Sequence, residues 1–141
     1  MSMVKFSDEI MREQLELFGE SFEYPVYCTS AVSKGLFSSG AFTTGYAAIS
    51  GAYLLIVRYD LAGTFSGKPI LERVSLASII KVKIREIVLL KGYRVEIQTR
   101  SENKKIKCRL QFLENVVGAE FPEQQQNARG LAAALNRYSS E

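Results

Sequence analysis

Residues 79–112 read IIKVKIREIVLLKGYRVEIQTRSENKKIKCRLQF, and this stretch decides the fold. Apolar and charged residues alternate along it, most clearly at 80–85 and 105–112. A period of two with many β-branched residues is typical of a half-buried antiparallel sheet. Residues 80–88 also fit a helical stripe, and only their density of isoleucine and valine favours a strand. The stretch therefore predicts three antiparallel strands, at 79–88, 93–100 and 105–112.

The β pattern continues on the N-terminal side of this stretch. Turn signals rich in glycine and serine divide it, among them GLFSSG at 35–40 and AGTFSGKP at 62–69. Four further strands are predicted between these signals, at 24–34, 41–50, 52–60 and 69–75.

An amphipathic helix is predicted at each end of the strands. Residues 7–18 have Ser7 as an N-cap and Gly19 directly after the end. Residues 121–138 form the second helix, which Gly130 weakens by about 1 kcal/mol unless a neighbour packs closely there. The first helix carries an apolar stripe that should face the core or a partner: Ile10, Met11, Leu15, Leu17 and Phe18. The chain is thus predicted to be α+β, mainly β.

Composition excludes several classes of protein. The chain has 141 residues, which suits one compact domain, and no histidine, which removes Ser-His-Asp and Cys-His catalysis. Its two cysteines, Cys28 and Cys108, form no CxxC motif and are expected to be buried and unreactive. Neither glycine-rich loop has the spacing of a phosphate-binding loop. We therefore predict no enzyme, no metal site and no cofactor.

No segment of the sequence has the pattern of a membrane span or a signal peptide. No apolar run approaches the length that a bilayer requires. The first ten residues, MSMVKFSDEI, lack an apolar core and a cleavage site. We therefore expect a cytoplasmic protein without a transmembrane segment.

Charge is unevenly distributed along the chain. The net charge is +3, but residues 1–24 carry −4 and residues 81–109 carry +7. A basic segment of this size can attract phosphate, a membrane or nucleic acid. It can equally be a solvated sheet face, partnered by the acidic N-terminus. Nucleic acid is not expected, because Tyr93 is the only aromatic residue in the basic segment 81–109.

Three stretches resemble the pleckstrin-homology (PH) superfold, and in particular the bacterial PH-like and GRAM-like families. GYAAISGAYLLIVRYD at 45–60 resembles the hairpin of the second and third strands. ERVSLASIIKVKI at 72–84 resembles the passage into the second sheet, and GYRVEIQTRSENKKIKCRLQF at 92–112 resembles the last hairpin. The resemblance implies a half-open barrel of seven antiparallel strands, capped by a C-terminal helix. Its domain would cover residues 23–141, with 1–22 as an added helical extension.

The chain departs from this family in two places. Many PH domains have a tryptophan in the last helix, whereas this chain has none, so Leu131 and Leu135 would fill that space. Inositide-binding members carry clustered cations on the first two strands. Here Lys34 is followed by no Lys or Arg until Arg58, so that motif is absent.

The hairpin loops predict which side chains lie side by side. Four-residue loops at 89–92 and 101–104 place the basic residues on one face. The resulting rows are Arg85–Glu96–Arg109, Lys83–Gln98–Lys107 and Lys81–Arg100–Lys105. In the first row Glu96 balances two arginines. The third row holds three cations and no acid, which costs stability unless a partner compensates it.

The resemblance also implies that three loops meet at one end of the barrel. The basic candidates there are Lys34, Lys68, Arg100, Lys104 and Lys105, with Lys81 joining them through the third row. The apolar tips beside them are Leu36, Phe37 and Phe65. Such tips suit an anionic membrane or an acidic protein; alternatively, the two phenylalanines fold back over the barrel mouth.

The expected function is a non-catalytic binding module that contacts a protein partner or another copy of itself. The acidic first helix and the basic sheet support self-assembly, because they have opposite charge. The alternative is weak peripheral binding to anionic phospholipid at the loop end, on the inner membrane face.

Overall fold

The computed structural model describes residues 5–34, 42–101, 104–116 and 121–138, and at 33, 34, 101 and 104 the backbone alone. The strands are β1 (Glu23–Lys34), β2 (Thr43–Ser50), β3 (Tyr53–Tyr59), β4 (Ile70–Ser75), β5 (Ile79–Ile87), β6 (Gly92–Ser101) and β7 (Lys104–Leu113). The helices are α1 (Asp8–Glu16), α2 (Leu61–Ser66), the 3-10 turn η1 (Leu76–Ser78) and α3 (Gln124–Asn136). The seven predicted strands and the two terminal helices are confirmed. Residues 79–87, where a helix also fitted the pattern, form a strand.

Helix α2 was not predicted, since its residues were assigned to a turn. Asp60 caps it, because its Oδ1 accepts a hydrogen bond from the Gly63 backbone N–H at 2.7 Å. The helix ends after one and a half turns at Gly67, which has a positive φ of 78°. The turn signal was therefore correct, but it contains a short helix.

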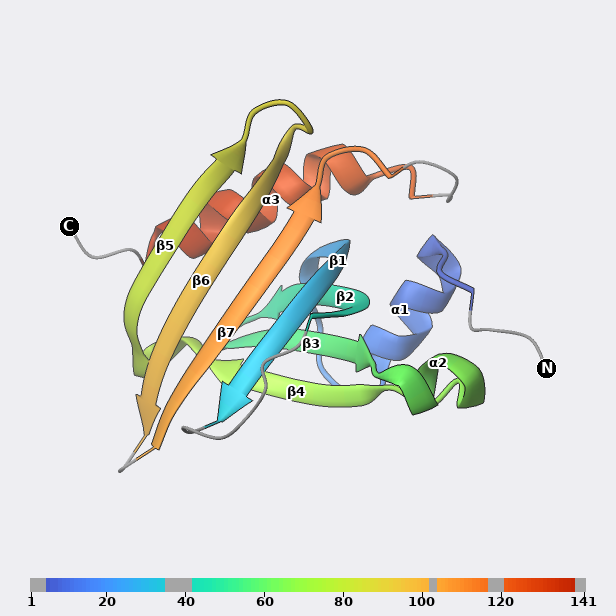
Figure 1. Cartoon of the computed structure of the whole chain (residues 1–141), viewed down its shortest axis with the longest axis horizontal. Coiled ribbons are helices and arrows are strands. Elements are labelled where there is room, and N and C mark those ends of the chain that lie inside the picture. Colours follow the sequence, from blue (N-terminus) through green and yellow to red (C-terminus); the bar gives the residue numbers. More distant parts are fainter. Residues whose placement is uncertain (1–4, 35–41, 102–103, 117–120, 139–141) are drawn as a thin grey trace.

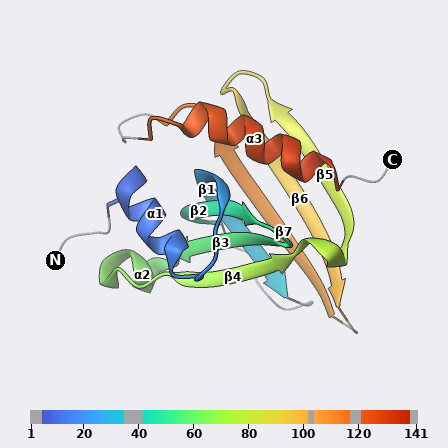
Figure 2. The same ribbon diagram turned by 180° about the vertical axis from the view of Figure 1, so that it is seen from behind.

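All the strands are antiparallel and form one sheet in the order β4-β3-β2-β1-β7-β6-β5. Strand β1 joins its two halves: Thr29 and Ser30 pair with β2 on one side and with β7 on the other. The sheet bends at β1, and α3 lies across the inner side of the bend (Figures 1 and 2). The fold is α+β, mainly β, and is consistent with the PH-like half-open barrel and its C-terminal helix. The resemblance implied two sheets, whereas here both halves belong to one.

Two hydrophobic clusters lie on opposite faces of β2 and β3. The inner cluster includes Leu54 and Ile56, and α3 adds Leu131 and Leu135, both fully buried as expected. The outer cluster is covered by Met11 and Leu15 of α1 and by Phe18, which follows the helix. Its sheet residues include Tyr46, Ala48, Leu55 and Val57. Strand β3 is therefore apolar at consecutive positions because both of its faces are buried. The predicted boundary after residue 22 runs through the outer cluster.

The terminal helices have the predicted signals, with two differences at their ends. Ser7 Oγ accepts a hydrogen bond from the Ile10 N–H at 3.2 Å, so Ser7 is the N-cap. Leu17, which was predicted on a stripe that faces the core or a partner, is the C-cap residue of α1 and is 61% exposed. In α3 the ring of Tyr24 packs directly against Gly130, leaving no room for a Cβ. Tyr138 lies beyond the end of α3 and is exposed.

Gln124 ties α3 to the sheet. Its side-chain oxygen accepts from the Tyr27 N–H at 3.0 Å, and its Nε2 donates to the carbonyls of Tyr27 and Leu113 at 3.0 and 2.8 Å. The Gln124 side chain is buried, so its single amide group supplies the hydrogen bonds that water would otherwise make with these backbone groups.

We expect Gln124→Ala to lower the free energy of unfolding by about 2 kcal/mol, because it leaves buried backbone groups without partners. Urea denaturation followed by circular dichroism measures this change. Gln126→Ala is the control, since Gln126 is exposed on the same helix. Equal effects of the two substitutions would show that the Gln124 hydrogen bonds contribute nothing measurable.

Candidate binding face

The outer face of β5, β6 and β7 is the surface opposite α3. The β6–β7 register is as predicted: Glu96 pairs with Arg109, Gln98 with Lys107, and Arg100 with Lys105. The predicted β5–β6 register is wrong by two residues, because Lys81 pairs with Gln98, and Lys83 with Glu96. The hairpin loop begins at residue 88, one position earlier than predicted. A shift of two residues exchanges row neighbours but leaves every side chain on its face.

The corrected rows are Arg85–Arg94–Gln111, Lys83–Glu96–Arg109 and Lys81–Gln98–Lys107, followed by Arg100–Lys105. The predicted row of three cations, Lys81–Arg100–Lys105, therefore does not form. Instead, Arg85 and Arg94 lie directly opposite each other, a like-charge pairing that destabilises a sheet. Arg94 Nε donates to Gln111 Oε1 at 3.1 Å, so its neighbour in the row is an amide, not an acid.

Glu96 is the one carboxylate among the described side chains of this surface. Its Oε1 lies 3.0 Å from Lys107 Nζ, a salt bridge to the next row instead of the predicted balance of two arginines. The Lys107 hydrogen bond lowers the pKa of Glu96, and the nearby charges of Lys83 and Arg109 lower it further, although burial opposes them. Glu96 is therefore ionised at neutral pH, but it cannot balance the surrounding cations.

We call this surface the basic face. Its eight cationic residues are Lys81, Lys83, Arg85, Arg94, Arg100, Lys105, Lys107 and Arg109. Glu96 forms a salt bridge with one of them, Lys107. The arrangement leaves a large positive surplus beside one acid, which favours binding of a negatively charged group.

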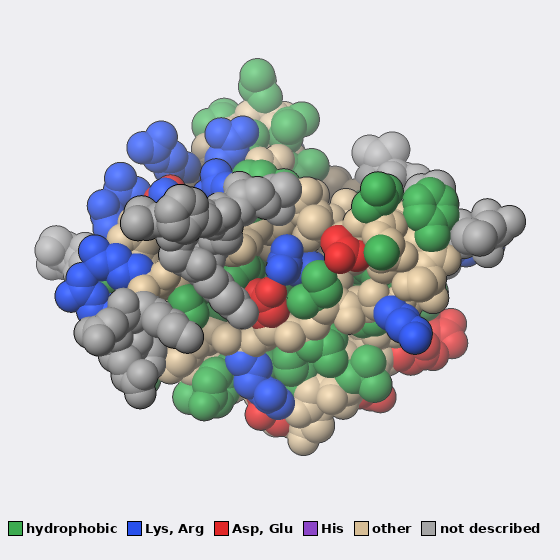
Figure 3. All heavy atoms as spheres, turned by 60° about the horizontal axis from the view of Figure 1, so that its bottom comes forward, with side chains coloured by type: hydrophobic (Ala, Val, Ile, Leu, Met, Phe, Trp, Pro, Cys, Tyr) green, Lys and Arg blue, Asp and Glu red, His purple; other side chains and the backbone are tan. Residues whose placement is uncertain are grey.

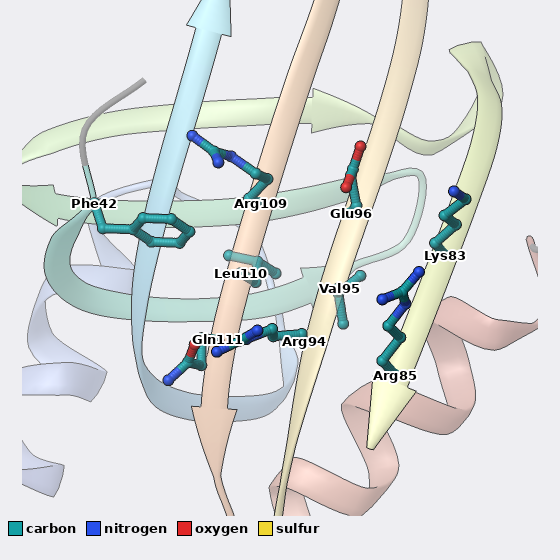
Figure 4. A pocket seen from close by; sticks show the side chains of 9 residues that line it. All are labelled: Phe42, Lys83, Arg85, Arg94, Val95, Glu96, Arg109, Leu110 and Gln111. Carbon is teal, nitrogen blue, oxygen red and sulfur yellow. Dashed lines mark hydrogen bonds between the residues drawn. The ribbon is translucent and has the colours of Figure 1, made fainter. Parts of the chain in front are cut away.

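A shallow groove crosses the basic face, with a volume of about 380 Å³. Figure 4 shows its lining: Phe42, Lys83, Arg85, Arg94, Val95, Glu96, Arg109, Leu110 and Gln111. The Arg109 guanidinium lies over the Phe42 ring, 4.8 Å from its centroid. Stacking on the ring holds this guanidinium on the surface at the edge of the groove.

The structure gathers only part of the predicted loop-end site. Lys34 pairs with Ile106, next to the Arg100–Lys105 pair, so three neighbouring strands bring these basic residues to one edge. Lys104 pairs with Ser101 at the same edge. Leu36 and Phe37 lie outside the described residues.

Phe65 and Lys68 do not join this group. They lie in α2 and just after it, at the opposite side of the molecule from the β6–β7 hairpin (Figures 1 and 2). The reason is the course of β1, which stops pairing with β2 at Ser30 and then follows β7. The end of β1 is thereby carried away from α2. Lipid binding at the predicted loop end loses these two residues and stays a prediction.

The sequence interpretation missed the groove, although it placed every cation on the correct face. Lys83 and Arg85 were assigned to rows that contained an amide or an acid, and Arg94 was in none of the three predicted rows. The register error therefore hid the excess of positive charge at these residues. Phe42 was assigned to a strand, with no sign that it would meet Arg109.

Both cysteines are buried inside the barrel, as predicted. Burial raises the pKa of Cys108 to about 12, and burial likewise raises the pKa of Cys28. Neither thiol ionises near neutral pH, so neither is an activated nucleophile. Within the described part of the chain, no three His, Cys, Asp or Glu residues are grouped so that they could hold a metal ion.

Sequence comparisons add no relative: no protein-family model matches the chain, and no curated protein matches it. None of the described helices has both the length and the apolar character to cross a membrane. The structure thus defines the class as an α+β, mainly β protein, with one seven-stranded antiparallel sheet, a helix at each end of the strands and a basic outer face.

Proposed function

We propose that the protein is a non-catalytic, cytoplasmic binding module related to the PH-like and GRAM-like domains, and that it binds protein through the basic face. The observation that carries this proposal is the surplus of eight cations over one carboxylate on a single sheet surface. Opposed arginines such as Arg85 and Arg94 cost stability in the free protein, and an acidic partner would remove that cost.

The partner that best fits this surface is a second copy of the chain. Glu9, Glu13 and Glu16 are exposed on α1 at i, i+4 and i+7, so they share one side of the helix. None of them forms a salt bridge with a described residue. In Figure 3 most Lys and Arg side chains gather at the left, where little acid is visible, and a group of acidic side chains lies at the lower right, beside a further basic side chain.

A contact between α1 of one copy and the basic face of the next is heterologous, which builds rings or open chains. The dimensions are compatible. A helix of nine residues is about 14 Å long, and three strands span about 10 Å. The outer side of α1 can therefore lie across β5, β6 and β7.

Charge reversal tests this proposal. One variant carries Lys83→Glu, Arg85→Glu and Arg94→Glu, and the other carries Glu9→Lys, Glu13→Lys and Glu16→Lys. At low ionic strength, sedimentation velocity should show self-association of the parent. Each variant alone should self-associate with an affinity at least about tenfold lower. A mixture of the two should associate again, because the reversed surfaces complement each other.

Added salt should weaken self-association of the parent, because it screens the attraction between the acidic and basic surfaces. Lys68→Glu is the control, because Lys68 is exposed on the far side near α2. A parent that is monomeric at every concentration in low salt would refute self-assembly. Retained association of the Lys83/Arg85/Arg94 variant would exclude the basic face as the contact.

A further inference from the structure

The β5–β6 hairpin ends in three consecutive exposed aliphatic residues. Val88 is 81% exposed, Leu89 95% and Leu90 58%. The hairpin projects at the top of Figure 1, and hydrophobic side chains protrude at the top of Figure 3. We call these three residues the aliphatic tip. They belong to neither of the two hydrophobic clusters, so the folded chain gains no burial from them.

Turn formation does not explain the aliphatic tip either. Tight turns between antiparallel strands favour Gly, Asn and Asp, whose backbones tolerate a positive φ. Here Lys91 has a φ of 49°, so this turn places a lysine where glycine or asparagine is preferred. Neither the local backbone nor the core requires three aliphatic residues at this position, which leaves an external contact as their physical explanation.

The residues around the aliphatic tip are mainly cationic. Lys91 follows it directly, while Arg85 and Arg94 lie opposite each other a few residues behind it. Glu86 is the exposed acid nearby, and it points to the other side of the hairpin with Tyr93. A second acid, Glu114, accepts a hydrogen bond from the Tyr93 hydroxyl. Its Oε2 also forms a salt bridge with Arg129 Nε at 3.1 Å.

We propose that the aliphatic tip inserts into an anionic lipid bilayer, while Lys91, Arg85 and Arg94 contact the lipid headgroups. The shape of the tip favours a bilayer over a protein. A stable protein interface buries about 800 Å² on each partner over a broad complementary surface, whereas a convex tip of three side chains offers far less. A bilayer needs no matching surface and accepts any apolar protrusion, and anionic headgroups complement the flanking cations.

This inference goes beyond the proposed protein contact and does not depend on it. Its aliphatic residues and Lys91 lie in the hairpin loop. Arg85 and Arg94 also belong to the basic face, but self-assembly requires α1 as well, and insertion of the tip does not. It also differs from the predicted lipid site at the loop end, because Val88–Leu90 lie at the other end of β6 from Arg100.

The test uses vesicles of phosphatidylcholine with or without phosphatidylserine. The parent should sediment with the phosphatidylserine vesicles, and Leu89→Ser should lower the affinity for these vesicles about tenfold, the effect of no longer burying one leucine. Leu61→Ser is the matched control: Leu61 is 79% exposed but lies on α2 at the far side of the molecule. It should bind like the parent. Failure of the parent to bind, or equal loss in both variants, would overturn the proposal.

A fluorescence measurement reports insertion directly, because the chain contains no tryptophan. Leu89→Trp should shift its emission to shorter wavelength on phosphatidylserine vesicles, and Leu61→Trp should not shift. No shift at position 89, or equal shifts at both positions, would contradict insertion of the tip. In the Glu9/Glu13/Glu16→Lys variant, adding Leu89→Ser should still weaken binding to the vesicles. This result would separate the lipid site from the self-assembly contact.

Discussion

A chain that begins at residue 23 is expected to lose cooperative folding and to aggregate. Without α1, the outer side of β2 and β3 would present Tyr46, Ala48, Leu55 and Val57 to water, and all four are fully buried in the intact protein. An apolar patch of this kind on a sheet promotes association between chains. Thermal unfolding by circular dichroism and size-exclusion chromatography measure the two effects. A truncated chain that melts like the parent would show that α1 is dispensable.

A point substitution gives the same information in the full chain. Leu15 is completely buried between α1 and the sheet, so Leu15→Ala should cost about 3 kcal/mol of unfolding free energy through lost contacts and a residual cavity. Leu17→Ala is the matched control, because Leu17 is 61% exposed two residues away. The control should change stability by about 0.5 kcal/mol or less. Equal losses would mean that α1 does not pack as described.

Gly45→Ala is expected to be the most damaging small substitution in the sheet. Gly45 lies in β2 opposite Arg58, and a Cβ at this position would overlap the carbonyl oxygen of Val57. The obstacle is backbone, which cannot rotate away as a side chain can. Relief therefore requires β2 and β3 to move apart, and we expect a loss of about 3 kcal/mol.

Urea denaturation of Gly45→Ala should be compared with that of Gly51→Ala. Gly51 has open space around its Cβ position and a φ of 49°, so an alanine there meets only backbone strain of about 1 kcal/mol. If Gly45→Ala proves no more harmful than Gly51→Ala, the close approach of β2 to β3 is not as described.

Local sequence predicted the elements well because each depends on nearby residues. Ser7 caps α1 by accepting a hydrogen bond from Ile10, only three residues away. Alternation in β5, β6 and β7 places charged and apolar residues on opposite faces. Even the register error left the basic face intact, because a shift of two residues keeps every side chain on the same face of the sheet. The observed register does change the candidate site: Lys81 leaves the row of Arg100 and Lys105, and Arg85 and Arg94 become direct neighbours.

The features that escaped prediction depend on contacts between distant segments. The hairpin loop could be placed one residue too late because VLLK and LLKG are both acceptable four-residue connections, and only pairing along β5 and β6 selects the first. Likewise, no local pattern says that Phe42 will lie under the Arg109 guanidinium. The exposure of Leu89 could not be predicted either, because the apolar residues of a hairpin turn can equally pack back onto the sheet.

The sequence by itself determined the number and type of elements, the antiparallel β class and the existence of one basic sheet surface. These follow from periodicity and capping, which act over a few residues. Tertiary structure alone decided which cations are neighbours, that α1 covers the apolar half of the outer face, and that α2 lies far from the β6–β7 hairpin. The cation neighbours depend on the pairing of β5 with β6, and the distance between α2 and the β6–β7 hairpin depends on the path of β1, which leaves β2 for β7 after Ser30. These pairings join segments that lie far apart in the sequence, so no short stretch of sequence encodes them.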